Sequence, residues 1–306
     1  METKNDEIKV SVITLAYNHE QYIGECINGI VSQQTNFKFE LLINDDASTD
    51  NTANIIREYV NLYPHIIKPI YQSENQYSKK IPIGKTYLYP LAKGKYIALC
   101  EGDDYWIDPL KLQKQVDFME ANPEYGMCYT QARHYYQDKK RFRSKVKGGK
   151  NETFKEFIDK NTVPTLTSMF RTNLFRQYME EIKPETRCWL MGDYPLWLWF
   201  AYNCKIKFIP EVTGVYRILS NSASHSPNYE KNADFIKSTF NIKEFFIKQY
   251  HQPESLINNI KQEFYKRMFA LSFSHKNTNE LKYYYQLLKH KNFKVYIKYW
   301  IRRYFW

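Results

Sequence analysis

The sequence contains little glycine, proline or cysteine, and each shortage excludes a class of protein. Ten glycines and 12 prolines among 306 residues exclude collagen-like and low-complexity chains, and a hydrophobic content of 43% excludes a wholly disordered one. The five cysteines form no CxxC pair, so we expect neither a disulfide framework nor a structural zinc site. The composition is that of a globular protein in a reducing compartment, the cytoplasm.

Long apolar runs and the common catalytic motifs are also missing. No run of about 18 apolar residues exists, so no helix is expected to span a bilayer. Residues 1–9 are polar and the apolar run from Val10 is short, which predicts that there is no signal peptide. There is no GxGxxG, GxxxxGKS/T, HExxH or GxSxG sequence, and the seven histidines lack the spacing of metal ligands. We therefore expect no dehydrogenase, P-loop NTPase, zinc protease or serine hydrolase, and we expect each histidine to be a surface or packing residue.

The N-terminal third alternates short apolar runs with helical patterns, as βαβ units do. This pattern predicts, in chain order, strand 10–16, helix 22–31, strand 39–43, helix 52–62, strands 66–71 and 95–100, and a helix from 108 to 122. Later elements are expected as strands at 127–134 and 164–171, an aromatic helix at 193–202, and two strands within 205–216 that break at Pro210. The sequence thus predicts an α/β fold, with only helices after residue 234.

Two acidic clusters stand immediately after predicted strands. The first is residues 44–48, with Asp45 and Asp46, and the second is residues 101–106. Ligands of parallel sheets bind at the carboxyl ends of the strands. Neighbouring carboxylates repel one another unless a cation or hydrogen-bond donors compensate, and oxygen ligands favour Mg²⁺ or Mn²⁺. Taken alone, each cluster is equally typical of turn and helix-cap residues.

Four segments in order resemble the motifs of the family 2, GT-A-type inverting glycosyltransferases: residues 10–18, 40–50, 94–106 and 191–194. The resemblance extends from residue 8 to about residue 220. It implies a GT-A Rossmann-like nucleotide-diphospho-sugar transferase fold, with a catalytic domain at 1–220. Its donor-binding half is expected at 1–125 and its acceptor-binding half at 126–220. Residues 221–306 match no family motif, and we expect them to form an α-helical, basic, aromatic-rich C-terminal extension.

The resemblance also implies roles for single residues in binding the donor. In the family, the residues that match Leu15, Ala16 and Tyr17 embrace the nucleotide base, and the aspartate that matches Asp46 accepts a hydrogen bond from it. The pair that matches Asp103 and Asp104 is the DxD element. We accordingly expect Asp103 to touch the ribose, and Asp104 to hold Mn²⁺ or Mg²⁺ on the diphosphate.

Asp193 resembles the family's catalytic base. A carboxylate there takes the proton of the acceptor hydroxyl in one inverting displacement, while the bound cation stabilises the charge that builds on the leaving diphosphate. Asp193 is also well placed to cap the helix that follows it. We expect the rings of that helix to stack on sugar faces; they belong to Tyr194, Trp197, Trp199 and Phe200.

The chain departs from the family pattern in two places. Many relatives have a histidine near the metal directly after a Tyr-Arg pair, but here Ile218 and Leu219 follow residues 216–217, and His225 is out of register. A third protein ligand of the metal is therefore in doubt. Relatives often have glycine and arginine where this chain has residues 75–91. This segment instead offers the diphosphate three lysines: Lys79, Lys80 and Lys85.

Two segments are strongly basic. Residues 139–150 hold seven basic and no acidic residues and two adjacent glycines, which predicts a mobile loop. Residues 282–306 combine seven basic residues with ten aromatic ones, a pattern typical of helices that lie in an anionic membrane interface. The alternatives are a compositional bias of the whole chain and a tail whose rings pack on the catalytic domain. Nucleic acid is not an expected partner, because no RNA- or DNA-binding signature accompanies the charge.

These features together predict an inverting, divalent-metal-dependent glycosyltransferase. The expected donor is a nucleotide-diphospho-sugar, with a UDP-sugar favoured, and the expected acceptor is a glycan or a lipid-linked glycan in cell-surface polysaccharide biosynthesis. The expected location is the cytoplasm or the inner face of the cytoplasmic membrane. Two alternatives stay open: a catalytically silent nucleotide- or polysaccharide-binding protein of the same fold, and a sugar-nucleotide nucleotidyltransferase, although the latter lacks a Gly-rich phosphate loop after its first strand.

Overall fold

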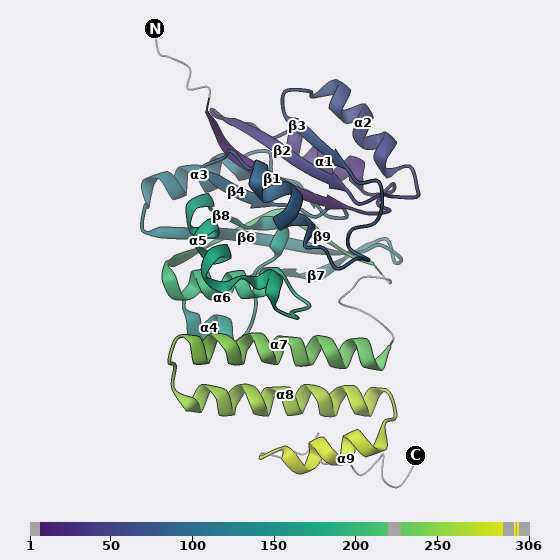
Figure 1. Ribbon diagram of the computed structural model, residues 1–306, viewed down its shortest axis with the longest axis vertical. Coiled ribbons are helices and arrows are strands. Elements are labelled where there is room, and N and C mark those ends of the chain that lie inside the picture. The colour runs from purple at the N-terminus through teal and green to yellow at the C-terminus, as the bar shows by residue number, and fades with distance from the viewer. Residues whose placement is uncertain (1–6, 220–227, 290–296, 298, 300–306) are drawn as a thin grey trace. The chain divides into compact units, whose positions relative to one another are not determined.

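The computed structural model describes residues 7–219, 228–289, 297 and 299 (Figure 1). The chain divides into two compact units. The first unit runs to Glu185 and takes in Phe200–Ile218, whereas the second takes in Thr186–Trp199 and the chain from Leu219 onward. The expected division of the chain at residue 220 stays a prediction.

The first unit is built on a mixed sheet, to which nine strands of the described residues belong. Their spatial order is β3-β2-β1-β4-β8-β6-β9-β5, with β7 beside β6. Strands β1 to β4 are parallel, and β8 is antiparallel to β4 and β6. The bounds are β1 (Ile8–Ala16), β2 (Lys38–Asp45), β3 (Ile67–Tyr71), β4 (Tyr96–Leu99), β5 (Tyr105–Trp106), β6 (Tyr125–Tyr136), β7 (Arg141–Lys147), β8 (Met169–Arg171) and β9 (Lys205–Ile218).

Helices connect the strands of this unit. They are α1 (Ile23–Val31), α2 (Thr52–Leu62), α3 (Lys111–Ala121), α4 (Phe154–Asp159) and α5 (Thr172–Ile182), while α6 (Asp193–Asn203) crosses from the second unit into the first. The first helix forms because Cys26, Ile27 and Ile30 recur at helical spacing, and all three are fully buried. Strand β2 is buried from Phe39 to Asp45, as expected for a parallel strand covered on both faces.

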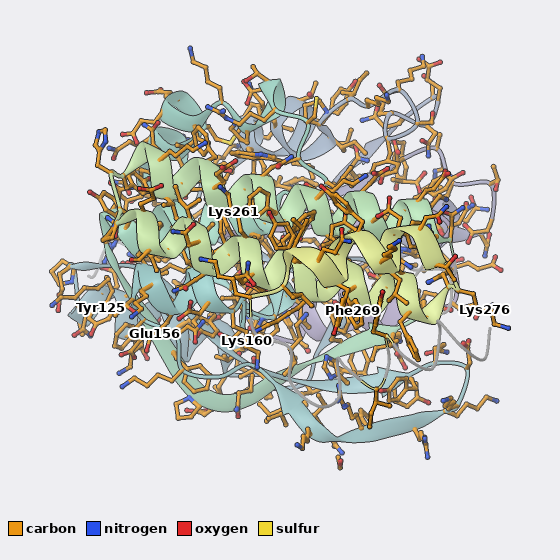
Figure 2. All side chains as sticks on the ribbon, turned by 90° about the horizontal axis from the view of Figure 1, so that it is seen from below. Tyr125, Glu156, Lys160, Lys261, Phe269 and Lys276 are labelled. Carbon is orange, nitrogen blue, oxygen red and sulfur yellow. The ribbon has the colours of Figure 1, made fainter. Side chains whose placement is uncertain are left out.

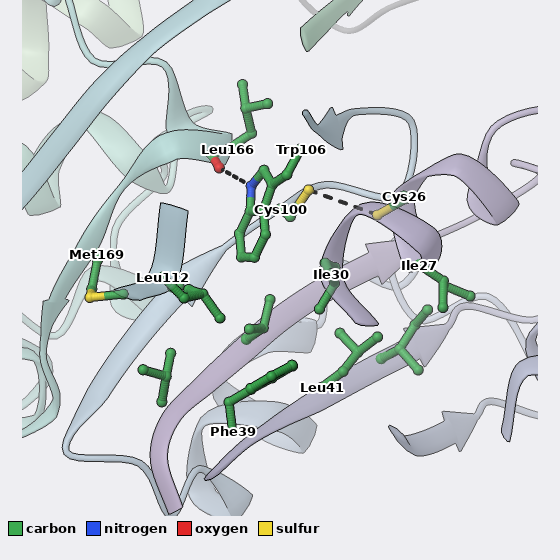
Figure 3. Packing of buried hydrophobic residues seen from close by; sticks show 14 of the residues in the cluster. Cys26, Ile27, Ile30, Phe39, Leu41, Cys100, Trp106, Leu112, Leu166 and Met169 are labelled. Atoms are coloured by element: carbon green, nitrogen blue, oxygen red, sulfur yellow. Dashed lines mark hydrogen bonds between the residues drawn. The ribbon is translucent and has the colours of Figure 1, made fainter. Parts of the chain in front are cut away.

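The core between the sheet and α1 and α3 is apolar and closely packed (Figure 3). Trp106 lies in it, and its indole Nε1 donates a hydrogen bond of 2.6 Å to the main-chain oxygen of Leu166. The thiols of Cys26 and Cys100 are 3.8 Å apart and both are free. Burial of each large apolar side chain contributes about 1.5–3 kcal/mol. This core gives the ends of β1 and β4 a rigid support.

A lysine lies within this apolar core. Lys111 is fully buried, its amine donates a 2.7 Å hydrogen bond to Gln115 Oε1, and it lies 3.9 Å from the centroid of the Trp106 ring. Burial lowers the pKa of Lys111 to about 7. Charging this amine near neutral pH therefore opposes folding.

Among the described residues, the second unit contains α7 (Tyr229–Gln249), α8 (Glu254–Ser274) and α9 (Thr278–Leu287), besides the start of α6. Phe269 on α8 lies in their shared core, whereas Lys276, just past the end of α8, is exposed (Figure 2). An ion pair of 2.6 Å joins the buried Lys243 of α7 to Glu263 of α8, whose side chain is 42% exposed. The expectation of an α-helical C-terminal region is confirmed for the described residues.

The basic and aromatic segment 282–306 is described only in part, because residues 290–296, 298 and 300–306 lie outside the described residues. Within the described part, Tyr284 is 7% exposed in the helical core, and the ring of Tyr285 stacks on Tyr299 at a centroid distance of 3.9 Å. Tyr283 is 56% exposed. Some of these rings therefore pack among the helices, and the membrane contact stays a prediction. Among the described residues, no helix is both long and apolar enough to cross a membrane.

Three expectations about strands are wrong. The strand expected at 164–171 is limited to β8, because Thr165–Thr167 form a 3-10 turn before it. Residues 141–147, expected in a mobile loop, form β7, because its residues pair with Ala132, Arg133, Tyr135 and Tyr136 of β6. Strand β9 also runs through Pro210 without a break. The register between β6 and β9 shifts at this place, so the proline, which has no N–H, falls in a bulge where the ladder needs no donor.

Candidate functional site

The carboxyl ends of β1, β2 and β4 meet at one edge of the sheet, as expected for neighbouring parallel strands. The main-chain oxygen of Leu15 accepts the N–H of Gly102 at 3.0 Å, and that of Ala16 accepts the N–H of Asp46 at 2.9 Å. Residues 15–17 therefore lie between the two acidic clusters. Leu15 and Tyr17 are 40% and 44% exposed, so their side chains are accessible to a ligand.

Asp46 is buried and holds the loop that follows β3. Its Oδ1 accepts the N–H of Gln76 at 2.8 Å, and its Oδ2 accepts the N–H of Tyr77 at 3.0 Å. The side chain of Asp46 is only 2% exposed, whereas Tyr77 is 75% exposed. The carboxylate thus fixes the position of this loop, and its contact with a base stays a prediction.

The loops that follow β1 and β2 are joined by several hydrogen bonds. Asn18 accepts the N–H of Thr49 at 2.8 Å through its side chain and donates its own N–H to Ser48 at 2.9 Å. His19 donates its N–H to the hydroxyl of Thr52 at 2.8 Å. Asn18 has a positive φ of 54°, a conformation that asparagine tolerates better than most residues. These bonds hold the two loops together beside the site.

The second acidic cluster is buried around Asp104. The side chain of Asp104 is 2% exposed, and its Oδ1 accepts the main-chain N–H of Arg217 at 2.7 Å. Burial raises the pKa of Asp104 well above its usual range, and the neighbouring carboxyls of Asp103 and Glu101 raise it further. A cation beside this cluster would offset both effects.

Arg217 ties the end of β9 to the acidic cluster and to α1. Its guanidinium donates a 2.6 Å hydrogen bond to the main-chain oxygen of Asp103, pairs with Glu25, and lies 4.4 Å from the ring centroid of Tyr105. It is only 5% exposed, and burial lowers its pKa to about 10. In the sequence, Arg217 stands out only as part of the Tyr-Arg pair that the family's histidine would follow, and no pattern points to Glu25.

His19 also lies at the cluster, although the sequence predicted a surface or packing residue. A Cβ atom on Gly102 would come within 2.8 Å of His19 Nδ1, so the close approach of the two loops requires glycine there. This Nδ1 is buried and has no hydrogen-bond partner among the described residues. Burial lowers the pKa of His19, and the charge of Asp103 opposes that effect. The imidazole is a site residue that spacing in the sequence does not reveal.

The residues present suit a divalent cation that takes some of its ligands from a substrate. No group of three or more histidine, cysteine, aspartate or glutamate side chains is gathered around a metal position within the described ranges, and His225 lies outside them. Asp103 and Asp104 supply two carboxylates, and Mg²⁺ characteristically binds one or two carboxylates together with phosphate oxygens. Because burial and the neighbouring carboxyls raise the pKa of Asp104, a bound cation would stabilise its ionised form.

Two of the three lysines expected near the diphosphate already have partners. Lys79 pairs with Glu74, and Lys85 pairs with Glu185. Lys80 is exposed and has a positive φ of 60°. Their contact with a diphosphate stays a prediction.

Asp193 is the first residue of α6 and belongs to the second unit, whereas Asp103 and Asp104 belong to the first. Its Oδ1 accepts the N–H of Tyr194 at 2.7 Å. Its role as a base stays a prediction. The expectation that the rings of α6 stack on sugars is wrong, because four of them are at most 1% exposed and belong to the core: Tyr194, Trp197, Trp199 and Phe200.

Residues 11–180 match a family model described as glycosyl transferase family 2. An uncharacterised protein of Mycobacterium tuberculosis is 34% identical over 230 residues, which are 71% of this chain and 61% of the relative. A UDP-Glc:α-D-GlcNAc-diphosphoundecaprenol β-1,3-glucosyltransferase of Escherichia coli is 36% identical over 112 residues, 37% of this chain and 41% of the relative. The chain thus spans about three fifths or less of the length of these curated relatives.

Two groups of solved structures have a similar fold. TarS of Staphylococcus aureus in complex with UDP-GlcNAc matches with a TM-score of 0.62 and 18% identity, over 96% of this chain and 79% of that one. A mannosyltransferase of Pyrobaculum calidifontis in complex with GDP-Man and Mn²⁺ matches with a TM-score of 0.55 and 15% identity, over 87% and 72%. At such identities the likeness is one of fold alone.

Proposed function

The chain belongs to glycosyl transferase family 2, and we propose that it transfers a sugar from a nucleotide-diphospho-sugar to an acceptor hydroxyl with inversion. The observation that carries this proposal is the acidic pair of buried Asp104 and half-buried Asp103, at the edge of the sheet where β1, β2 and β4 end. The raised pKa of Asp104 supports a role in which a positively charged ligand completes the cluster.

In this proposal the donor is a UDP-sugar, bound at the end of β1. The half-exposed side chains of Leu15 and Tyr17 contact the base, with the main chain of Ala16 between them and Asp46 accepting a hydrogen bond from the base. The UDP and UDP-GlcNAc that name the TarS complexes and the UDP-glucose in the name of the E. coli relative support a UDP-sugar.

Asp103 and Asp104 would hold the divalent cation, with Asp103 also touching the ribose. The cation, Mn²⁺ or Mg²⁺, would act as a Lewis acid for the leaving diphosphate. The main-chain N–H of Arg217 favours the ionised form of Asp104, and the guanidinium of Arg217 fixes the main chain of Asp103. The Mn²⁺ in the mannosyltransferase complex supports the choice of metal.

Asp193 would take the proton of the acceptor hydroxyl as that oxygen attacks the sugar. A glycan or lipid-linked acceptor in cell-surface polysaccharide biosynthesis is supported by the diphosphoundecaprenol acceptor that names the E. coli relative. With such an acceptor, the enzyme would act in the cytoplasm or at the inner face of the cytoplasmic membrane. Changing Asp193 to Asn should leave donor binding intact and lower transfer at least a hundredfold, which binding and transfer assays on the same preparation would separate.

The first test is thermal unfolding of the full chain with UDP, GDP, CMP and their sugar conjugates, each with and without Mn²⁺. A ligand that binds only the folded state stabilises it, by about 2.7 kcal/mol at a hundred times its Kd. We expect UDP to raise the unfolding temperature when Mn²⁺ is present, and we expect Asp103→Asn to abolish this rise. The control is Asp117→Asn, an exposed aspartate of α3. If no nucleotide stabilises the folded chain, the catalytically silent alternative replaces the proposal.

A further inference from the structure

The most basic surface of the first unit is the stretch 139–150, here called the basic hairpin. It contains seven lysine and arginine residues and no acidic residue. Strand β7 makes up most of it, and the residues from Arg141 to Val146 are all exposed. Within the described residues, an ion pair is found for Lys150, with Glu152, but for no basic side chain of β7. Three cationic side chains of this short strand, Arg141, Arg143 and Lys145, are therefore exposed, and that of Lys147 is half-buried.

The basic hairpin is an ordered part of the sheet. Strand β7 pairs with β6 alone among the described strands, so it forms an edge. The two glycines that follow are held in place, because Gln131 donates to the main-chain oxygen of Gly148 at 3.3 Å and the hydroxyl of Tyr129 donates to that of Gly149 at 2.6 Å. The charges are thus presented on a fixed support.

The inner end of the basic hairpin reaches the candidate site. The amine of Lys147 lies 4.1 Å from the ring centroid of Tyr216, the residue before Arg217, whose N–H binds Asp104. The charge of Lys147 lowers the pKa of Asp104, against the larger effect of burial. A strand rises about 3.3 Å per residue, so the charges extend roughly 20 Å from Lys147 to Arg141.

We infer that the basic hairpin binds phosphate groups of the acceptor and leads the acceptor toward the acidic cluster, an inference that rests on the proposed function. In the proposed function, the metal ion at Asp103 and Asp104 binds the single diphosphate of the donor. The basic side chains of β7 extend roughly 20 Å from Lys147, so they are available to a different anion. Arginine in particular binds phosphate through two parallel hydrogen bonds.

A lipid surface fits the basic hairpin less well. Binding in a membrane interface needs free apolar side chains that can be inserted beside the charges. Strand β7 has only two apolar residues, Phe142 and Val146, which are 40% and 43% exposed, and the ring of Phe142 also contacts the guanidinium of Arg133 at 4.0 Å and the ring of Tyr135 at 4.9 Å. The geometry therefore favours an acceptor chain that carries phosphate.

The test compares two triple variants of the full chain with the unchanged protein. Arg141→Gln/Arg143→Gln/Lys145→Gln removes three charges from β7 and leaves Lys147 in place. The control, Lys68→Gln/Lys155→Gln/Lys160→Gln, removes three charges from other exposed lysines of the first unit, one of which is labelled in Figure 2. The probe is linear polyphosphate, titrated by calorimetry in the presence of saturating UDP and Mn²⁺ so that the donor site is filled.

We expect polyphosphate to bind the β7 variant at least about tenfold more weakly than the unchanged protein, with a smaller dependence on salt, and the control variant within about twofold. Equal losses in both variants, or no loss in the β7 variant, would overturn the inference. Equally tight binding of polygalacturonate would overturn the preference for phosphate. Loss of binding to phosphatidylglycerol vesicles, with polyphosphate unaffected, would make the hairpin a membrane contact instead.

The thermal stabilisation by UDP, measured on the same variants, separates this inference from the proposed function. We expect it to be unchanged in the β7 variant, which also shows that the variant is folded. If UDP stabilises none of the proteins, the proposed function fails whatever polyphosphate does. If UDP stabilises all of them and the β7 variant binds polyphosphate normally, only the inference about the hairpin fails.

Discussion

Asp46 and Asp104 each follow a buried parallel strand, and each side chain is 2% exposed, yet their surroundings differ. Two main-chain N–H groups, those of Gln76 and Tyr77, donate to the carboxylate of Asp46. Asp104 accepts the N–H of Arg217 and has two other carboxyls as neighbours, which add to the effect of burial on its pKa. Burial costs a carboxylate little among donors and much among other carboxylates. The chain itself supplies donors to the carboxylate of Asp46, whereas Asp104 lies among like charges, an effect that a cation would offset.

The largest expected effect tests this difference at Asp104. Asp104→Asn should lower the Mn²⁺-dependent release of UDP from a UDP-sugar roughly a thousandfold, because an amide is a poor ligand of a divalent cation. Without metal at pH 7, its free energy of unfolding in urea should not fall, because the amide oxygen still accepts the N–H of Arg217 and no buried charge opposes folding. A variant that releases UDP at the normal rate, or that is strongly destabilised, would contradict the comparison.

Lys111 extends the comparison to a buried cation. Because its pKa is lowered to about 7, the folded state binds fewer protons than the unfolded state between pH 7 and the ordinary lysine pKa. This side chain thus makes stability rise with pH in that range, by up to about 1.4 kcal/mol per unit. Lys111→Met should abolish this rise of stability with pH, and the variant should be more stable than the unchanged protein at pH 7. The measurement is urea unfolding of both proteins at pH 7, 8 and 9, from which the free energy of unfolding is plotted against pH. The buried thiols have the opposite effect on this slope, but they are the same in both proteins, so the difference between the two slopes isolates Lys111. An unchanged slope would show that the amine is solvated in the folded chain.

The smallest of these effects is expected at Asp46. Asp46→Asn replaces a carboxylate that accepts two N–H groups by an amide with one acceptor oxygen, so one N–H, of Gln76 or of Tyr77, faces an NH₂ group instead. We expect a loss of about 1–3 kcal/mol in the free energy of unfolding. Urea unfolding of this variant, with the exposed Asp117→Asn as control, gives the number. A loss no larger than that of the control would mean that the loop after β3 is held by other contacts.

The expected α/β fold of GT-A type with a helical C-terminal region is confirmed, and its best-predicted part is local. The helix expected at 52–62 has the same bounds in the structure, because apolar side chains at helical spacing decide such an element within one segment. Strand β7 was missed because its charges and following glycines indicated a loop, although Phe142, Ser144 and Val146 alternate with basic residues as in a strand. Pairing with β6, a tertiary effect, decides the outcome.

The acidic residues of the site were predictable because they directly follow strands. The residues that surround them were not. Arg217 pairs with Glu25, although most of the sequence of the first unit lies between them. His19 lies close to Gly102, which belongs to a different loop. Such meetings depend on the sheet order, which brings β9 next to β5 and β1 next to β4, and on no local pattern. The rings of α6 were wrongly expected to face a ligand, because the same spacing of aromatic residues occurs in a helix buried in a core.

Among the five free cysteines, Cys188 alone is exposed. Burial raises the pKa of Cys100 well above its usual range and those of Cys128 and Cys204 to about 12, which keeps these thiols in their unreactive protonated form. A maleimide dye or spin label added to the native protein should therefore attach to Cys188, in the second unit, before any other site. The natural chain thus carries its own single attachment point for spectroscopy, from which the response of the helical unit to donor and acceptor can be followed without an engineered cysteine.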